Sequence, residues 1–248
     1  MEEVIRVEHL SKSYGRIKAV DDFSFSVRRG TVFGLLGANG AGKSTVIECV
    51  LGTRKADGGS VSILGMNPTS DRKALFEQVG VQFQETHFQE NIRVGELCAV
   101  TASLYRRPTN HLDLLRRLGI DDKTGKPVKE LSGGEQQRLF IVLALIPDPE
   151  VVFLDELTTG LDARARRTVW IILEGLKKEG LTILLTSHFM DEVEALCDEI
   201  CVLKSGRPVF SGTVEEAIRR SPHERFEDAY LWFTDEEGGQ DEVIRNDT

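Results

Sequence analysis

The chain has 248 residues, and its 40 acidic and 31 basic side chains give a formal net charge of −9 at neutral pH. A field of that sign repels nucleic-acid phosphates and anionic membrane surfaces, so neither is expected as a bulk electrostatic partner. Residues 235–248 hold six acids and one base, which leaves the rest of the chain only mildly acidic. The content of 40% apolar and 29% charged residues excludes a disordered or fibrous protein.

The longest apolar run covers residues 139–146 and ends at Pro147. Eight residues are far short of the roughly 20 that cross a bilayer, and the first residues do not resemble a signal peptide. We therefore expect a cytosolic protein, unless a partner holds it at a membrane. The four cysteines include no Cys-x-x-Cys pair, which favours packed, reduced thiols over a zinc site or disulfides.

In chain order, the first expected elements are strands at residues 5–10 and 23–27. Their polar and apolar residues alternate, as in half-exposed antiparallel strands. Residues 31–36 form a short apolar strand, which is followed by a glycine-rich turn and a helix over 44–51. Strand, loop and helix in this order open an α/β nucleotide-binding fold.

Later runs are apolar almost throughout, which is typical of strands buried on both faces of a mostly parallel sheet. They lie at residues 79–83, 151–154, 181–185 and 200–203, with helices expected over 163–178 and 190–196. Between residues 85 and 147 no such run occurs, while 92–105 and 112–118 show helical spacing, so we interpret this stretch as a helical insertion. A strand at 208–210 and a helix from Val214, with a capping box of Thr213 and Glu216, follow.

These patterns predict an α/β fold with a mostly parallel core sheet, a flanking antiparallel β layer and an inserted helical subdomain. We expect a first part of the nucleotide-binding core with the antiparallel layer over residues 1–85, and the helical subdomain over 86–147. A second part of the core is expected over 148–220, and a C-terminal extension with an acidic, mobile tail over 221–248.

Residues 37–44, GANGAGKS, match the phosphate-loop pattern. Glycines let consecutive backbone N–H groups converge on phosphate oxygens, and the following helix adds its dipole. Lys43 is placed to reach the β- and γ-phosphates, and the Ser44 hydroxyl to bind Mg²⁺. A chance match in a glycine-rich turn is the alternative, but the preceding strand and following helix are both expected here. The candidate nucleotide-contacting residues of this P-loop are Gly37, Asn39, Gly40, Ala41, Gly42, Lys43, Ser44 and Thr45.

The strand at residues 151–154 ends in two acids, Asp155 and Glu156. Beside a phosphate loop, Asp155 would hold the metal ion, mainly through water. Glu156 could then orient and deprotonate an attacking water. The alternative is a strand that ends in a solvated acidic turn.

Residues 131–138, LSGGEQQR, begin a helix, because Ser132 and Glu135 stand at capping-box spacing before an apolar run. A capping box alone is usually structural. Two glycines in the first turn, however, each cost about 1 kcal/mol relative to alanine. That cost is explained if the backbone must approach a ligand closely, and an anion at the helix N-terminus would be such a ligand.

With these three elements in this order, the sequence resembles the ATP-binding cassette (ABC) family over about residues 1–220. The elements look like that family's first phosphate motif, its second motif and its LSGGQ-type signature. The resemblance implies a P-loop NTPase fold and ATP with Mg²⁺ as the ligands. It also implies catalytic roles for Lys43, Glu156 and His188, the last as the switch histidine that contacts the γ-phosphate.

The same resemblance implies roles for further positions. Tyr14 would stack on adenine, although an aromatic near a strand end is on its own more often a core residue. Gln84 would touch Mg²⁺ and sense a transmembrane partner, with Gln82 as a competing assignment. Asp162 would communicate across a dimer of cassettes. The metal-binding candidates are Ser44, Gln84 and Asp155.

Two positions depart from the family pattern. Glu135 stands where the best-known signature has glutamine, a common variation. Leu157 stands where DEPT-type sequences have proline after the catalytic glutamate. Loss of that proline frees the φ angle of the turn but leaves both acids in place, so we expect catalysis to be retained.

In the ABC family two cassettes bind head to tail, and each signature helix closes over ATP held by the opposite phosphate loop. One chain has one of each motif, so we expect a dimer with a second copy or another cassette, in which Ser132 and Gly134 act in trans. Transport would need a separate integral-membrane permease subunit, docked near the helical insertion and Gln84. The protein would then be cytoplasmic, peripheral on the inner face of the cell membrane.

The stretches 84–105, 156–167 and 226–234 look like cassettes of the ABC-2 type exporters, the drug, antibiotic and polysaccharide or lipid efflux group. An importer cassette is the alternative within the class. A soluble ABC ATPase acting on ribosomes or DNA is another alternative. The two cassettes or long coiled coil usual in such proteins are absent here, and no nucleic acid is expected. The intact motif residues oppose a non-catalytic regulatory cassette.

Overall fold

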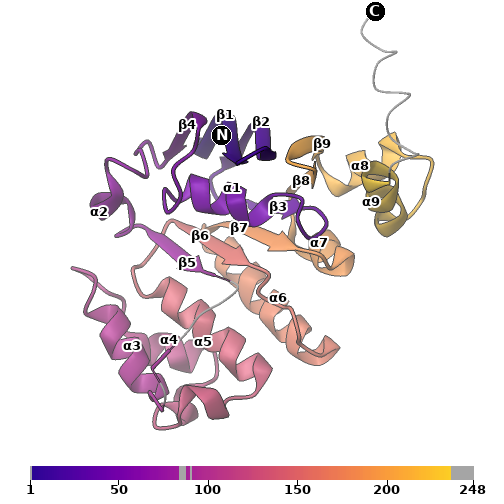
Figure 1. Ribbon diagram of the computed structural model, residues 1–248. Helices are drawn as coiled ribbons and strands as arrows, with labels where there is room; N and C mark the ends of the chain where they lie inside the picture. The colour runs from indigo at the N-terminus through magenta and orange to yellow at the C-terminus, as the bar shows by residue number, and fades with distance from the viewer. Residues whose placement is uncertain (1, 84–87, 90, 236–248) are drawn as a thin grey trace, which may run out of the picture.

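The computed structural model describes residues 2–83, 88–89 and 91–235. A three-stranded antiparallel sheet has the order β2-β1-β4, and a six-stranded sheet has the order β5-β6-β7-β3-β8-β9 (Figure 1). In the larger sheet all neighbours pair in parallel except β8 and β9. The strands are β1 (Glu3–Tyr14), β2 (Ile17–Arg28), β3 (Val32–Leu36), β4 (Gly58–Ile63), β5 (Val79–Gln82), β6 (Val151–Asp155), β7 (Thr182–Ser187), β8 (Glu199–Lys204) and β9 (Arg207–Gly212).

The helices cover both faces of the larger sheet (Figure 1). They are α1 (Lys43–Val50), α2 (Arg72–Leu75), α3 (Val94–Ala102), α4 (His111–Arg117), α5 (Gly133–Leu145), α6 (Ala163–Lys178), α7 (Met190–Leu196), α8 (Val214–Arg220) and α9 (Phe226–Thr234), with 3₁₀ turns at Asp121–Lys123 and Val128–Glu130. The mostly parallel sheet, the antiparallel layer and the helical stretch before β6 were all predicted. The elements β4, α2 and α9 were not.

The core lies on both sides of β6, in which every residue is buried. Val151 and Phe153 belong to the hydrophobic cluster that includes α1 and the antiparallel sheet. Val152 and Leu154 belong to the cluster that includes α5 and α6. Because successive residues of a strand face opposite sides, this near-continuous apolar run seats the phosphate-loop helix on one face and the signature helix on the other.

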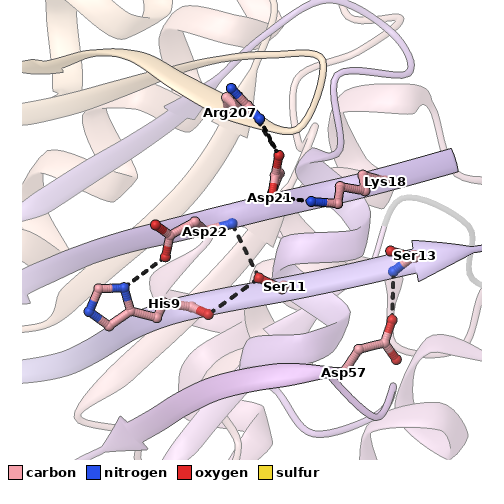
Figure 2. Close-up of polar contacts among 8 residues, drawn as sticks. All are labelled: His9, Ser11, Ser13, Lys18, Asp21, Asp22, Asp57 and Arg207. Carbon is pink, nitrogen blue, oxygen red and sulfur yellow. Dashed lines mark hydrogen bonds and ion pairs between the residues drawn. The ribbon is translucent and has the colours of Figure 1, made fainter.

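Polar contacts tie the antiparallel sheet to its surroundings (Figure 2). The Asp21 carboxylate accepts hydrogen bonds from Arg207 in β9, at 2.6 and 2.9 Å, and from Lys18 at 3.0 Å. These cations lower the pKa of Asp21. Asp57 accepts a hydrogen bond from the backbone N–H of Ser13 at 2.7 Å. The end of β1 that carries Tyr14 is therefore fixed by the segment before β4.

Across the described ranges, none of the helices combines the length and the apolar character needed to span a bilayer.

Gly80 in β5 marks a close approach to α5. A Cβ atom at this position would lie 2.0 Å from the carbonyl oxygen of Ala144. We therefore expect Gly80→Ala to lower the free energy of unfolding by about 1–3 kcal/mol, as overpacking does. Gly175 lies within α6, and a Cβ added there would meet no atom within 4 Å beyond the adjacent residues and the nearby backbone of its own helix. Gly175→Ala should therefore raise the free energy of unfolding by about 0.5–1 kcal/mol. Urea unfolding compares the two, and a Gly80→Ala variant as stable as the parent would contradict the packing described.

Candidate functional site

The phosphate loop joins β3 to α1, as predicted. Gly42 has a φ of +109°, and a Cβ there would lie 2.3 Å from the carbonyl oxygen of Ala19. Only glycine tolerates both that backbone conformation and that distance. Gly42 is also the N-cap of α1 and supplies no capping side chain. The first N–H groups of the helix are thus left for another acceptor, which suits an anion.

Lys43 folds back over the loop. Its Nζ donates hydrogen bonds to the carbonyl oxygens of Gly37 and Ala38, at 2.7 and 3.2 Å. The side chain is buried, and this burial lowers the pKa of Lys43, while the charges of Glu156 and Asp155 act in the opposite direction. A buried cation next to exposed Ala38, Asn39 and Gly40 is well placed to attract phosphate oxygens.

Asp155 ends β6 in a buried position. Its Oδ1 accepts a hydrogen bond from Thr186 Oγ1 at 2.5 Å, from the neighbouring strand β7. Burial raises the pKa of Asp155, against smaller opposing effects of the Thr186 hydrogen bond and Lys43. A carboxylate that lacks a full counter-charge at this strand end is suited to a cation.

Of the two glutamines in residues 79–85, the structure describes only Gln82. Gln82 is buried at the end of β5, where its Oε1 accepts from the backbone N–H of Asp155 at 3.2 Å and its Nε2 donates to the Phe83 carbonyl at 2.6 Å. Gln82 therefore fixes the backbone of Asp155 in this structure. Gln84, predicted to touch Mg²⁺, lies outside the described residues.

Glu156 occupies a strained turn, with a φ of +49°. Its backbone N–H donates to the carbonyl oxygen of Thr186 at 3.2 Å and to Thr186 Oγ1 at 3.0 Å, which holds the turn against β7. Its Oε2 lies 3.7 Å from Nδ1 of His188. Leu157 is buried in the same cluster as Leu154, so packing of its side chain anchors the turn where the family has a proline ring.

Tyr14 stands at the end of β1 with 41% of its surface exposed. The guanidinium carbon of Arg54 lies 5.3 Å from its ring centroid, and Lys12 Nζ lies 5.8 Å from it. Arg54 is itself bound by Glu48 at 2.5 Å. The ring is therefore not a core residue, and it remains available for stacking with a base.

The signature segment forms the predicted capping box. Ser132 Oγ accepts from the Glu135 N–H at 3.3 Å, and Glu135 Oε2 accepts from the Ser132 N–H at 2.9 Å. A Cβ on Gly134 would lie 3.1 Å from Cβ of Ala165 in α6. Close packing of α5 against α6 is thus one reason for a glycine here, beyond the ligand predicted from sequence.

An open hollow of about 370 Å³ lies beside this contact and is lined by residues at the start of α5 and at the start of α6. Ser132, Gly134, Asp162 and Arg164 are among its lining residues, and no residue of the phosphate loop lines it. Asp162 caps α6 by accepting from the Ala165 N–H at 2.8 Å. The structure thus gathers Lys43, Asp155, Glu156 and His188 at one strand edge and leaves the signature residues at a separate hollow.

Several contributing residues were missed from the sequence. Thr186 holds both Asp155 and Glu156, and strand pairing alone brings it there. Arg138 donates to the carbonyl oxygens of Gly134 and Gly119, at 3.2 and 2.9 Å, and so braces the signature helix. Because Arg138 follows Gly134 by one helical turn, the sequence could have predicted its contact with Gly134.

Comparisons with known proteins agree with this geometry. A family model described as ABC transporter matches residues 20–159. The Nod factor export ATP-binding protein I of Ralstonia nicotianae is 40% identical over 220 residues, which cover 87% of this chain and 68% of that protein. The protein of the same name from Sinorhizobium fredii is 40% identical over 213 residues, covering 84% and 62%. The chain thus spans about two thirds of the length of these relatives.

Solved structures show the same fold. An ATP-binding subunit of an ABC transporter superposes with a TM-score of 0.83 at 26% identity, covering 94% of this chain and all of that one. An ATP-binding cassette of an ABC transporter in its ADP conformation gives 0.78 at 26% identity, covering 93% and 99%. This chain belongs to the ABC transporter family, as an ATP-binding subunit with ATPase activity.

Asp155→Asn should raise the thermal midpoint of the nucleotide-free protein at neutral pH and abolish hydrolysis. Since burial raises the pKa of Asp155, the folded state binds this proton more tightly than the unfolded state. The stability that the proton confers is present below the unfolded pKa and is lost as the pH rises through the folded pKa. Asparagine keeps the acceptor for Thr186 without the buried charge, so its advantage should be larger at about pH 7 than at about pH 4.5. Scanning fluorimetry at both pH values measures this, and a lower midpoint for the variant at pH 7 would contradict it.

Proposed function

We propose that this chain is the ATP-hydrolysing subunit of an exporter, working as a head-to-tail dimer beneath a separate integral-membrane subunit. The direction is taken from the relatives, whose name states export, and from the likeness of three stretches to ABC-2 type cassettes. Such a protein would be cytoplasmic and peripheral on the membrane through its partner. The observation that carries the proposal is the separation of the signature hollow from the phosphate loop within one chain.

At the strand edge, Lys43 and the N–H groups at the start of α1 would bind the β- and γ-phosphates. The Ser44 hydroxyl and Asp155 carboxylate are oxygen donors of the kind Mg²⁺ prefers, and they would hold this ion, whose charge neutralises charge on the phosphates. Asp155 is buried at the end of β6, and a cation bound there would favour its ionised form.

Glu156 would take a proton from the attacking water, and His188 would contact the γ-phosphate from beside it. The 3.7 Å between His188 Nδ1 and Glu156 Oε2 supports a joint role. The left-handed turn at Glu156 is the kind of strained backbone that active sites retain. Tyr14, with its exposed ring, would stack on adenine.

The second half of the ATP site would come from another copy. Ser132 and Gly134 lie at the N-terminus of α5, where exposed N–H groups favour an anion. In a head-to-tail dimer they would close over ATP held by the partner's phosphate loop. Binding would pull the two copies together, and hydrolysis would release them.

Glu156→Gln should convert a monomer into a stable dimer on addition of Mg-ATP, because nucleotide binds but is no longer cleaved. Light scattering should then give twice the 27.7 kDa of one chain, and hydrolysis should fall by at least about 10²-fold. Adding Lys43→Ala should remove nucleotide binding and the dimer together. Adding Ser132→Arg instead should leave binding of a fluorescent ATP analogue intact but prevent the dimer. A Glu156→Gln protein that binds Mg-ATP and stays monomeric would contradict the proposal.

A hollow between α2 and the turn that follows α3 is our candidate for the surface that docks the membrane subunit. Its volume is about 440 Å³, and Phe76, Leu104 and Tyr105 line it together with Arg72, Lys73 and Glu77. Leu104 is 74% exposed. An apolar hollow with a charged rim, next to the helical insertion, suits a short amphipathic segment of a membrane protein.

Leu104→Asp should abolish recovery of a multi-span protein with the tagged chain from detergent extracts, while the ATPase activity of the isolated subunit stays within twofold. Leu104 is exposed, so the fold should tolerate the charge. Ile171→Asp is the matched control, since Ile171 is 70% exposed on α6 outside this hollow. Equal recovery with both variants would exclude this docking surface, and repeated recovery of ribosomes by the parent chain would favour a non-transport role.

A further inference from the structure

Helix α6 opens with arginines where a helix disfavours cations. Arg164, Arg166 and Arg167 lie within its first five residues, and its first turn contains no acid. The N-terminal end of a helix carries partial positive charge, so a cation there is unfavourable. Arg166 is moreover only 20% exposed, and its buried Nε has no hydrogen-bond partner within the described part of the chain. The contacts that Arg166 makes must offset these costs.

Arg166 contacts two residues that follow His188 in the chain. Its guanidinium carbon lies 4.5 Å from the ring centroid of Phe189, inside the roughly 6 Å of a cation–π contact. Its Nη1 lies 3.4 Å from Oδ2 of Asp191, in the first turn of α7. The guanidinium is therefore held between an aromatic face and a carboxylate, both on the segment that leaves β7.

The Phe189 ring packs against the imidazole of His188. The two ring centroids are 4.2 Å apart, with an interplanar angle of 37°. The backbone N–H of Phe189 donates to Ser187 Oγ at 3.0 Å, which fixes the chain at this point. His188 Nδ1 also lies 3.7 Å from Glu156 Oε2. Arg166, Phe189, His188 and Glu156 thus form a continuous series of contacts from α6 to the turn after β6.

We propose that Arg166 and Phe189 are positioning residues for ATP hydrolysis, which hold the imidazole of His188 in the orientation required at the γ-phosphate. The proposal rests on the switch role proposed above for His188. The His188 side chain is 41% exposed, so without these contacts it would sample several rotamers. Stacking on a fixed ring restricts that freedom before nucleotide binds, as preorganisation requires.

The same contacts connect His188 to the loop that leads into α6. The backbone N–H of Arg166 donates to the carbonyl oxygen of Asp162 at 3.0 Å, so the arginine lies one turn from that residue. Asp162 also lines the signature hollow. A shift of this loop when a second copy docks would move the start of α6, and Arg166 would transmit the shift to Phe189 and His188.

A purely structural role is the competing explanation, because Arg166 also joins α6 to α7. The chain offers a matched control for this possibility. Trp170, one turn further along α6, donates from Nε1 to Oε1 of the buried Glu192 in α7 at 3.0 Å. Trp170→Phe should remove this link between the helices and lower the thermal midpoint, without acting on His188.

The experiment measures kcat, KM for Mg-ATP and thermal midpoint for variants of the 248-residue chain. Phe189→Leu and Arg166→Gln should each lower kcat by about tenfold, with KM changed less than twofold, because a misoriented group costs rate more than affinity. Phe189→Tyr keeps the ring and should restore kcat to within twofold of the parent. The double variant Arg166→Gln with Phe189→Leu should lower kcat no further than either single variant, since both substitutions interrupt the same series of contacts.

The His188→Ala variant distinguishes a failure of the switch role of His188 from a failure of the positioning role of Phe189 and Arg166. If it retains full activity, the switch role is wrong and the proposal falls with it. If it is inactive while Phe189→Leu keeps kcat within twofold of the parent, only the positioning role is wrong. A loss of kcat in Phe189→Leu that Trp170→Phe matches, at an equal drop in thermal midpoint, would also overturn the proposal in favour of helix packing.

Discussion

The burial of the mostly parallel sheet on both faces is the constraint on which the rest of the structure depends. Because neighbouring residues of β6 point in opposite directions, the same strand supports α1 on one face and α5 with α6 on the other. The shared direction of β3, β6 and β7 brings the phosphate loop, Asp155 and His188 to one edge. The signature helix α5 packs on the face opposite α1 (Figure 1), so in the proposed dimer each chain contributes two spatially separate halves of an ATP site.

The residues at this edge of the sheet are held in states that are energetically unfavourable for each of them. Lys43 and Asp155 are buried, and burial lowers the pKa of Lys43 and raises that of Asp155, which favours the neutral form of each. Glu156 adopts a left-handed backbone conformation. Thr186 hydrogen-bonds with both Asp155 and Glu156, and Gln82 accepts from the backbone N–H of Asp155, so the neighbouring strands hold these two acids in place. Such an arrangement sacrifices stability, and a cation with a bound polyanion would relieve part of the cost.

Local rules were sufficient to predict much of this from sequence. The capping boxes of Ser132 and Thr213 and the apolar strand before Asp155 follow from short-range patterns, and all are present. Strand β4 was missed because its glycines and serines form a half-exposed strand that pairing with β1 stabilises. Helix α9 was missed although Phe226 and Phe233, seven residues apart, both belong to one buried hydrophobic cluster. The contact of Arg166 with Phe189 depends on how α6 packs against the chain after β7, which no local pattern encodes.

The most direct test of the account is whether the two halves of the ATP site meet between chains. In a Glu156→Gln background, one preparation would carry Asn39→Cys in the phosphate loop and the other Ser132→Cys in the signature. Cys49, Cys98 and Cys201 are buried and Cys197 is partly buried, and burial raises the pKa of all four thiols, so the native cysteines should react slowly. After mixing and mild oxidation, the account predicts a covalent dimer that forms with Mg-ATP and not without it. No cross-link in the mixture, or a cross-link within a single chain that carries both cysteines, would contradict a site shared between two copies.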